Sequence, residues 1–240
     1  MTVMSRAEVV LLHPAGGYWE LFRDAPNMPL NLLCAASQIY ERYNVRIIDQ
    51  RHGLGWRDDL KRAIGKDTIC VGITTYTGPS IVGALSMCRM VRELTKAPIV
   101  WGGIHVSLMP WQSLDHPCVD MIVVGEGELA FSNLVDALAT DRDTNGIPGV
   151  LTTKNIAIAH GQQLFLKMDE LPPLPYELIN VEKYLPSFRG SKTMNFQTSR
   201  GCPMRCGFCY NTVFNKSAWR AMSAPVVISR IKKTVLDHGI

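Results

Sequence analysis

The sequence lacks long hydrophobic runs. Apolar stretches such as residues 9–12 and 121–124 are far shorter than the roughly 20 residues that a membrane-spanning helix needs. The first eight residues, Met-Thr-Val-Met-Ser-Arg-Ala-Glu, also lack the apolar core of a signal peptide. We therefore predict a cytoplasmic protein with no membrane span.

The sequence also has no internal repeat, no low-complexity tract and no cysteine pattern typical of a secreted disulfide framework. A cytoplasmic protein keeps its thiols reduced or uses them as metal ligands. Cys34, Cys70 and Cys88 lie in apolar, periodic segments, so we predict that they are buried small side chains. A hydrophobic content of 47% in 240 residues is sufficient for a sizeable core.

Acidic residues are scarce near the end of the chain. Residues 184–240 contain nine Lys and Arg against one acidic residue, whereas residues 1–183 contain more acidic than basic side chains. A basic segment can bind nucleic acid or another anion, or it can be balanced by acidic residues elsewhere in the fold. After the last of its cysteines, the aromatics that could stack on bases are limited to Tyr210, Phe214 and Trp219, so nucleic acid is the less favoured partner.

Strand and helix patterns alternate along the first 139 residues. Short apolar strands are predicted at residues 8–13, 44–49, 68–74, 98–101 and 119–124. Helical spacing of apolar residues predicts helices at 29–40, 56–64, 79–94 and 126–138. This alternation indicates an α/β fold, a Rossmann- or flavodoxin-like parallel five-stranded sheet covered on both faces. Such a sheet binds ligands beyond the carboxyl ends of its strands, which here are followed by short loops.

The pattern changes after residue 144. Residues 149–153 and 163–166 are predicted to pair as a hairpin, and the prolines at 172, 173 and 175 predict a linker because proline breaks helices and ladders. Residues 192–198 alternate like a strand, and a helix is predicted from Ser223 to Gly239. We therefore divide the chain into an α/β domain (1–144), a hairpin and proline-rich linker (145–190) and a C-terminal segment (191–240).

Three cysteines lie within eight residues of the C-terminal segment. Cys202, Cys206 and Cys209 have the spacing C-x3-C-x2-C and no fourth cysteine nearby. Iron–sulfur clusters usually take four thiolate ligands, so three leave one iron open to another ligand. Structural zinc is the main alternative, but it is usually closed by four Cys or His ligands, and the nearest histidines, His160 and His238, are far away in sequence.

This loop resembles the cluster loop of the radical S-adenosylmethionine (SAM) superfamily, in its spacing, its Gly-Cys-Pro entry and the aromatic Phe208 before the third cysteine. The resemblance implies a 4Fe–4S cluster on the three cysteines, SAM on the open iron, and the backbone of Phe208 near the SAM adenine. It also implies an external electron donor such as flavodoxin or ferredoxin. Arg200 and Arg205 would place positive charge beside the cluster, with an ordinary salt bridge as the alternative role for each.

The strand-end loops of the α/β domain resemble the cobalamin-binding domain that precedes the barrel in one class of radical SAM enzymes. They are rich in glycine and hydroxyl residues, which allow close backbone approach and suit a phosphate-bearing ligand. The similarity covers roughly residues 8–139. The cobalamin contacts that it implies are Thr74, Thr75, Gly78, Gly102, Gly103, His105, Ser107, Gly125, Glu126 and Gly127.

The loop after the second strand departs from the pattern of cobalamin carriers. Carriers have D-x-H-x-x-G, in which the histidine ligates cobalt, whereas Asp49 stands one position too early for His52. Many radical SAM members show D-x-R here, which Asp49 and Arg51 match. The resemblance therefore favours cobalt without a lower histidine, and His52 as ligand is the minority interpretation.

The resemblance implies a cobalamin-dependent radical SAM enzyme that acts on a small-molecule substrate, by methyl transfer, rearrangement or cyclisation. Two alternatives stay open: a cobalamin- or nucleotide-binding module without catalysis, and radical SAM modification of nucleic acid. A complete (β/α) barrel takes at least about 200 residues, and residues 191–240 supply only its first β-α unit. We therefore expect a truncated chain that is incomplete for turnover.

Overall fold

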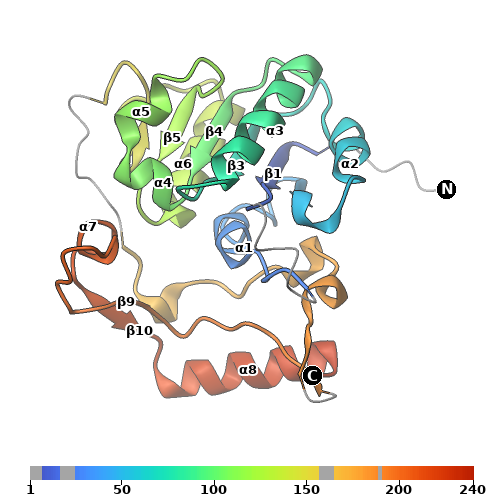
Figure 1. The fold of residues 1–240 in the computed structure, drawn as a ribbon, viewed down its shortest axis with the longest axis vertical. Helices are drawn as coiled ribbons and strands as arrows, with labels where there is room; N and C mark the ends of the chain where they lie inside the picture. Colours follow the sequence, from blue (N-terminus) through green and yellow to red (C-terminus); the bar gives the residue numbers. More distant parts are fainter. Residues whose placement is uncertain (1–6, 17–24, 157–164, 189–190) are drawn as a thin grey trace.

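A twisted sheet runs through the upper part of the molecule (Figure 1) in the computed structural model, which describes residues 7–16, 25–156, 165–188 and 191–240. Its strands are β1 (Val9–His13), β2 (Val45–Asp49), β3 (Cys70–Thr74), β4 (Ile99–Gly102), β5 (Met121–Val123) and β6 (Val150–Leu151). They are ordered β2-β1-β3-β4-β5-β6. The first five strands are parallel, and β6 pairs antiparallel with β5.

The five parallel strands confirm the predicted parallel sheet, and the sixth strand corrects its predicted size. Val150 and Leu151, from the first strand of the predicted hairpin, pair with Val123 and Ile122. Both residues are buried, because at the edge of β5 they gain backbone hydrogen bonds and also pack against the core. Residues 157–164, which include part of the predicted hairpin, lie outside the described residues.

Helices cover both faces of the sheet. They are α1 (Leu30–Ala36), α2 (Trp56–Ala63), α3 (Ser80–Leu94), α4 (Ile104–Leu108), α5 (Pro110–Leu114) and α6 (Gly127–Ala139). Residues of α2 and α3 pack in one core cluster, and residues of α1 and α6 pack in the other. All five residues of β1 and of β3 are buried, as expected for central parallel strands with a helical layer on each face.

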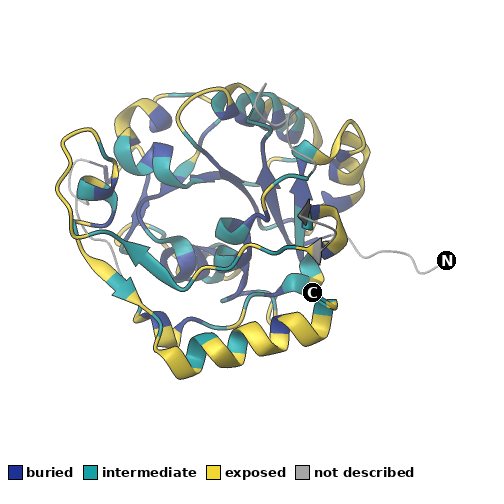
Figure 2. Ribbon diagram, turned by 60° about the horizontal axis from the view of Figure 1, so that its bottom comes forward, coloured by how far each residue is buried: buried dark blue, intermediate teal, exposed yellow. Residues whose placement is uncertain are grey.

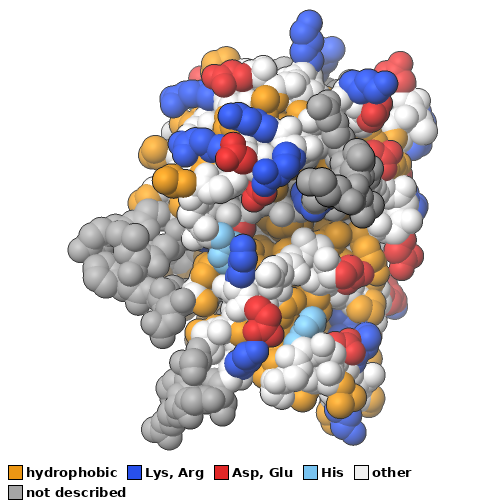
Figure 3. Space-filling view, turned by 90° about the vertical axis from the view of Figure 1, so that its right-hand side faces the viewer, with side chains coloured by type: hydrophobic (Ala, Val, Ile, Leu, Met, Phe, Trp, Pro, Cys, Tyr) orange, Lys and Arg blue, Asp and Glu red, His pale blue; other side chains and the backbone are white. Residues whose placement is uncertain are grey.

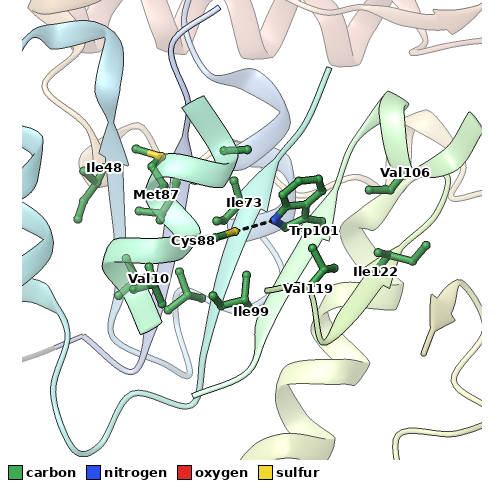
Figure 4. Packing of buried hydrophobic residues seen from close by; sticks show 14 of the residues in the cluster. Val10, Ile48, Ile73, Met87, Cys88, Ile99, Trp101, Val106, Val119 and Ile122 are labelled. Carbon is green, nitrogen blue, oxygen red and sulfur yellow. Dashed lines mark hydrogen bonds between the residues drawn. The ribbon is translucent and has the colours of Figure 1, made fainter. Parts of the chain in front are cut away.

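Cysteine burial agrees with the prediction at two of three positions. Cys70 and Cys88 are fully buried, and Cys88 Sγ accepts a hydrogen bond of 3.2 Å from Trp101 Nε1 inside the core (Figure 4). Cys34 is only half-buried. It lies on α1 and lines a cavity, so Cys34 is less buried than predicted.

The segment after β4 is helical rather than the loop that we predicted. Residues 104–108 form α4, and Gly103, with φ of +99°, makes the turn into it. The helix spans only five residues, too few for a hydrophobic period to be visible in the sequence.

The C-terminal part of the chain forms a thinner layer below the sheet (Figure 1). Its elements are the 3₁₀ turns η3 (Met168–Glu170), η4 (Tyr176–Leu178) and η5 (Val181–Tyr184), the strands β7 (Ser187–Phe188), β8 (Ser191–Lys192), β9 (Ser199–Gly201) and β10 (Trp219–Ala221), and the helices α7 (Asn211–Phe214) and α8 (Ala224–His238). A further 3₁₀ turn, η2 (Gln50–His52), follows β2.

The predicted strand at residues 192–198 is wrong for residues 193–198, which are irregular. Strand β9 begins only at Ser199, where β10 provides an antiparallel partner. An alternating pattern is not enough without a neighbouring strand to accept the backbone hydrogen bonds. The cysteine loop therefore starts from a two-stranded ribbon, β9–β10.

Helix α8 confirms the predicted ends, with Ser223 as N-cap residue and Gly239 in the left-handed conformation at its C-cap. Much of the helix is exposed, as the yellow surface of α8 in Figure 2 shows. Ile231 and Val235, which lie four residues apart on one side of the helix, are 40% and 39% exposed. Within the described residues, no helix is both long and apolar enough to cross a membrane.

Candidate functional site

A cavity of about 420 Å³ lies at the carboxyl ends of β3, β4 and β5. One wall comes from the sheet, its loops and α1, and includes Asn31, Thr74, Tyr76, Gly102, Gly103, Gly125, Glu126 and Gly127. The opposite wall comes from the flanks of the cysteine loop and includes Ser199, Arg200, Gly201, Tyr210, Phe214 and Asn215. The cavity therefore joins the predicted ligand-binding edge of the sheet to the segment that carries the three cysteines.

Six of the ten predicted cobalamin contacts line this cavity. These six are Thr74, Gly102, Gly103, Gly125, Glu126 and Gly127. The other four do not line it and are Thr75, Gly78, His105 and Ser107. The strand ends thus reach the cavity, and so do Tyr76 and Ile104 further along the β3 and β4 loops.

The two neighbouring glycines after β4 differ in their surroundings. A Cβ atom on Gly102 would meet nothing within 4 Å, so the backbone there borders open space. A Cβ atom on Gly103 would lie 2.7 Å from the Thr75 carbonyl oxygen, and the φ of +99° strains any other residue. Gly102 therefore leaves room for a ligand, and Gly103 allows the β3 and β4 loops to pack together.

His105 and Ser107 lie on α4 and hold neighbouring loops together. The Nδ1 atom of His105 lies 3.1 Å from Thr77 Oγ1, and burial lowers the pKa of the imidazole. Ser107 Oγ donates to the Gly103 carbonyl at 2.8 Å and accepts from the Gly125 amide at 2.9 Å. Ser107 thereby fixes the β4 loop to the β5 loop behind the cavity wall.

Buried polar groups gather at the ends of β1 and β2. Asp49 and Arg51 form an ion pair at 2.6 Å, with side chains only 3% and 7% exposed. Tyr184 of the C-terminal layer donates its hydroxyl to Asp49 Oδ2 at 2.9 Å. Burial, reinforced by the nearby Arg51 charge, lowers the pKa of His13 to about 4. The residues that match D-x-R are therefore a structural junction between the sheet and the C-terminal layer.

His52 is exposed and packs against the linker rather than facing the cavity. Its ring meets that of Tyr184 edge-on, with 4.6 Å between the centroids. Burial lowers the pKa of His52, although Asp49 acts in the opposite direction. His52 does not line the 420 Å³ cavity.

The cysteine loop extends from the ribbon to the surface. Cys206 is exposed, Cys202 and Cys209 are half-buried, and Phe208 is 94% exposed. Asn211 anchors the loop by donating its side-chain amide to the Cys202 carbonyl at 2.7 Å.

The three thiols suit an iron–sulfur cluster by their chemistry, because such clusters are held by cysteine thiolates. Their arrangement is open: within the described part of the chain, no three His, Cys, Asp or Glu side chains gather closely enough to hold a metal ion. The loop carries the right ligands on an accessible segment, with one end fixed to the ribbon.

Several cavity residues were missed by the sequence analysis. Asn31 of α1 donates to Thr74 Oγ1 at 2.5 Å, and Tyr76 and Tyr210 line opposite walls. Cys34 Sγ lies 3.3 Å from Arg200 Nη2, and burial raises the pKa of its thiol to about 12. No local pattern marks these residues, because they meet only when α1 and the ribbon are both placed against the sheet.

A second, larger cavity of about 1220 Å³ lies between α1, the proline-rich segment and α8. Both cavities share Leu30, Cys34, Glu128, Gln197 and Arg200 as lining residues. On the face shown in Figure 3, hydrophobic side chains appear between charged side chains above and below. The larger cavity has a mixed lining of charged and apolar groups and none of the strand-end glycines, which line only the smaller of these two cavities.

Comparison with known proteins identifies a matching family model and several relatives. Residues 20–135 match the family model described as the B12 binding domain. An uncharacterised methyltransferase of Pyrococcus horikoshii is 33% identical over 217 residues, covering 88% of this chain and 47% of the relative. An anaerobic magnesium-protoporphyrin IX monomethyl ester cyclase of Cereibacter sphaeroides is 27% identical over 243 residues, covering 97% of this chain and 39% of the relative.

The fold is similar to that of TsrM from Kitasatospora setae, a radical SAM methyltransferase whose structure contains cobalamin and a 4Fe–4S cluster. The TM-score is 0.72 at 20% identity, over 97% of this chain and 46% of that one. The chain spans less than half the length of each of these three proteins.

The fold and the site define a B12-binding α/β domain joined to a cysteine-containing segment. Residues 20–135 thus match the B12 binding domain, and over most of its length the chain is similar to proteins named as methyltransferases and cyclases.

Proposed function

We propose that this chain is the cofactor-binding part of a cobalamin-dependent radical SAM enzyme, which transfers a methyl group to a small-molecule substrate, or cyclises or rearranges it. One observation carries the proposal. The strand-end glycines and the flanks of the cysteine loop line the same 420 Å³ cavity. The names of the relatives, methyltransferases and a cyclase, support this range of reactions.

The sheet edge is the proposed cobalamin site. Thr74, Gly102, Gly103, Gly125 and Gly127 would border the bound group, and the open space beside Gly102 supports a close approach of ligand to backbone. Thr75, Gly78, His105 and Ser107 would act from behind the wall by fixing the loops. Parallel α/β sheets bind ligands at this edge, so the position follows the general rule.

The cysteine loop is the proposed cluster and SAM site. Cys202, Cys206 and Cys209 would bind the cluster, and the exposed Phe208 leaves its backbone accessible to SAM. When bound, the cluster supplies the electron that cleaves SAM, and cobalamin carries a methyl group. The exposure of Cys206 is consistent with access for an external donor such as flavodoxin or ferredoxin.

Anaerobic reconstitution tests the proposal. The chain is incubated with iron, sulfide and hydroxocobalamin and desalted, and its absorption spectrum and its iron and cobalt contents are measured. We expect about four irons and one cobalt per chain. Replacing the three loop cysteines with Ala should abolish iron binding and leave cobalt bound, whereas Cys118→Ala, outside the loop, should retain both.

The outcomes separate the alternatives. Cobalt without a cysteine-dependent cluster would indicate a cobalamin-binding module without radical chemistry. A cluster without cobalt would indicate a radical SAM protein whose α/β domain binds something else, and the absence of both would refute the proposal. Replacing His52 with Ala should leave the corrin spectrum unchanged, because His52 lies outside the cavity.

A further inference from the structure

Two buried carboxylates at the start of α6 have their cationic partners far along the chain. The side chains of Glu126 and Glu128 are each only 5% exposed. A buried carboxylate is costly unless a cation neutralises it. The cations are Arg200 and Arg220, and the Arg220–Glu126 contact joins residues 94 positions apart.

The contacts form a continuous network. Arg200 Nη1 lies 3.3 Å from Glu126 Oε2, and Arg200 Nη2 lies 2.6 Å from Glu128 Oε1. Arg220 Nη1 donates to Glu126 Oε2 at 3.1 Å, and its Nη2 also contacts that carboxylate. Arg220 further donates to the Leu166 carbonyl at 3.2 Å and stacks on the Phe165 ring at 4.4 Å. We call Glu126, Glu128, Arg200 and Arg220 the arginine–glutamate latch.

The β9–β10 ribbon carries two adjacent positive charges that these carboxylates neutralise. Arg200 and Arg220 are directly opposite each other in the β9–β10 ladder, and like charges in such a pair repel. Glu126 binds both arginines and Glu128 binds Arg200, so the two carboxylates offset this repulsion and attach the ribbon to the start of α6. The basic C-terminal segment is thus balanced in part by acids of the B12-binding domain.

The latch lies beside the first cysteine. Arg200 is followed by Gly201, whose φ of +85° turns the chain into Cys202, and a Cβ on Gly201 would lie 1.9 Å from the Ala218 carbonyl oxygen. This tight packing leaves little freedom between the arginine and the cysteine loop. Glu128 and Arg200 also line both cavities, so the latch forms part of the wall between them.

We propose that the arginine–glutamate latch sets the position of the cysteine loop over the sheet edge, and so fixes the separation of the two cofactors. The inference rests on the proposed function, and it deepens the role of Glu126. Glu126 lines the cavity, but its carboxylate is bound by two arginines, so the Gly125–Glu128 motif borders the cavity and also holds the ribbon. All four latch residues are positioning residues.

The latch itself can be tested in the chain without cofactors. Hydrogen–deuterium exchange is followed in β9 and β10 for Glu128→Gln, for Arg200→Lys, and for the reversed pair Arg200→Glu with Glu128→Arg. Glu128→Gln should speed exchange in the ribbon at least tenfold and leave β1 and β3 unchanged. Arg200→Lys keeps the positive charge and should speed exchange less than Glu128→Gln does, whereas the reversed pair should also speed exchange, because it places a carboxylate at position 200 beside Glu126.

A matched control is Arg62→Gln. Arg62 forms an ion pair of the same 2.6 Å length with Asp59, but both side chains are more than half exposed. This control should leave exchange unchanged everywhere. Unchanged exchange of the ribbon in both Glu128→Gln and Arg200→Lys would overturn the proposed role of the latch. Equally faster exchange in β1 and in the ribbon would also overturn it, because the residues would then stabilise the whole fold.

The effect on the cofactors has its own readout. In the reconstituted protein, electron paramagnetic resonance measures the magnetic interaction between cobalt(II) cobalamin and the reduced cluster. Glu128→Gln should weaken or broaden this interaction while iron and cobalt contents stay the same. If the unaltered chain binds neither group, the proposed function fails, whereas binding of both with an interaction unaffected by Glu128→Gln refutes the latch alone.

Discussion

Replacing each of the paired glycines after β4 with alanine should separate folding from cofactor binding. A Cβ on Gly102 meets nothing within 4 Å, although Gly102 lines the cavity. A Cβ on Gly103 meets the Thr75 carbonyl oxygen at 2.7 Å and the Thr75 amide nitrogen at 3.1 Å. The two substitutions add the same methyl group at adjacent positions, so each serves as the control for the other.

The expected magnitudes follow from these distances. At Gly103, a side chain in the backbone region reserved for glycine costs about 1–3 kcal/mol, and forcing two backbone segments apart costs about 1–3 kcal/mol more. Gly103→Ala should therefore lower the free energy of unfolding by about 2–5 kcal/mol. Gly102→Ala lacks both penalties and should change it by less than about 1 kcal/mol.

Corrin binding should be weakened by Gly102→Ala, the variant that leaves stability nearly unchanged. The methyl group of Gly102→Ala projects into the cavity that we assign to cobalamin, so we expect at least about a tenfold loss of affinity, or 1.4 kcal/mol. Urea denaturation measures the stability of each variant, and spectroscopic titration with hydroxocobalamin measures its affinity. Unimpaired binding by Gly102→Ala would refute the placement of the cobalamin site, and an unaltered stability of Gly103→Ala would refute the described packing.

Three further predictions concern stability. Burial lowers the pKa of His13 to about 4 in the folded protein, whereas His13 protonates near pH 6.5 in the unfolded chain. The free energy of unfolding should therefore fall by about 3 kcal/mol as the pH drops from 6.5 to below 4, and His13 should add no pH dependence above pH 6.5. Denaturation of His13→Asn should show a smaller loss across this range, and an unchanged slope would contradict the assignment. Tyr184→Phe removes the hydroxyl that donates to Asp49 and should cost about 1.5–3 kcal/mol in urea denaturation; a loss below 0.5 kcal/mol, of the order of experimental error, would argue against this bond. Gly201→Ala should open the β9–β10 ribbon to limited proteolysis, and adding Ala218→Gly should not rescue it, because the clash involves the backbone carbonyl of Ala218.

Local patterns were sufficient for the sheet and most of its helices. The apolar run of β1 and the helical spacing of α3 depend on residues within a few positions of each other, so they are visible in the sequence. Helix α8 was likewise predictable from Ser223 and Gly239, which act through local backbone geometry. The carboxyl ends of the parallel strands then located the candidate site without any knowledge of its walls.

Other features depended on partners that the sequence does not reveal. Residues 193–198 alternate like a strand but form no continuous ladder with the described strands, whereas Val150 and Leu151 join β5 as a sixth strand. His105 and Ser107 were grouped with the paired glycines because they are close in sequence, yet the short helix α4 turns them behind the cavity.

The sequence by itself determined the chemistry: three thiols at C-x3-C-x2-C, glycines at the strand ends, and a basic segment around the cysteines. Only the tertiary structure decided how these parts meet. Arg200 and Arg220 approach each other because β9 and β10 pair, and they reach Glu126 and Glu128 because the ribbon lies at the carboxyl edge of the sheet. The physical reason is that burial of these charges is tolerated only when all four are brought together, which long-range packing alone achieves.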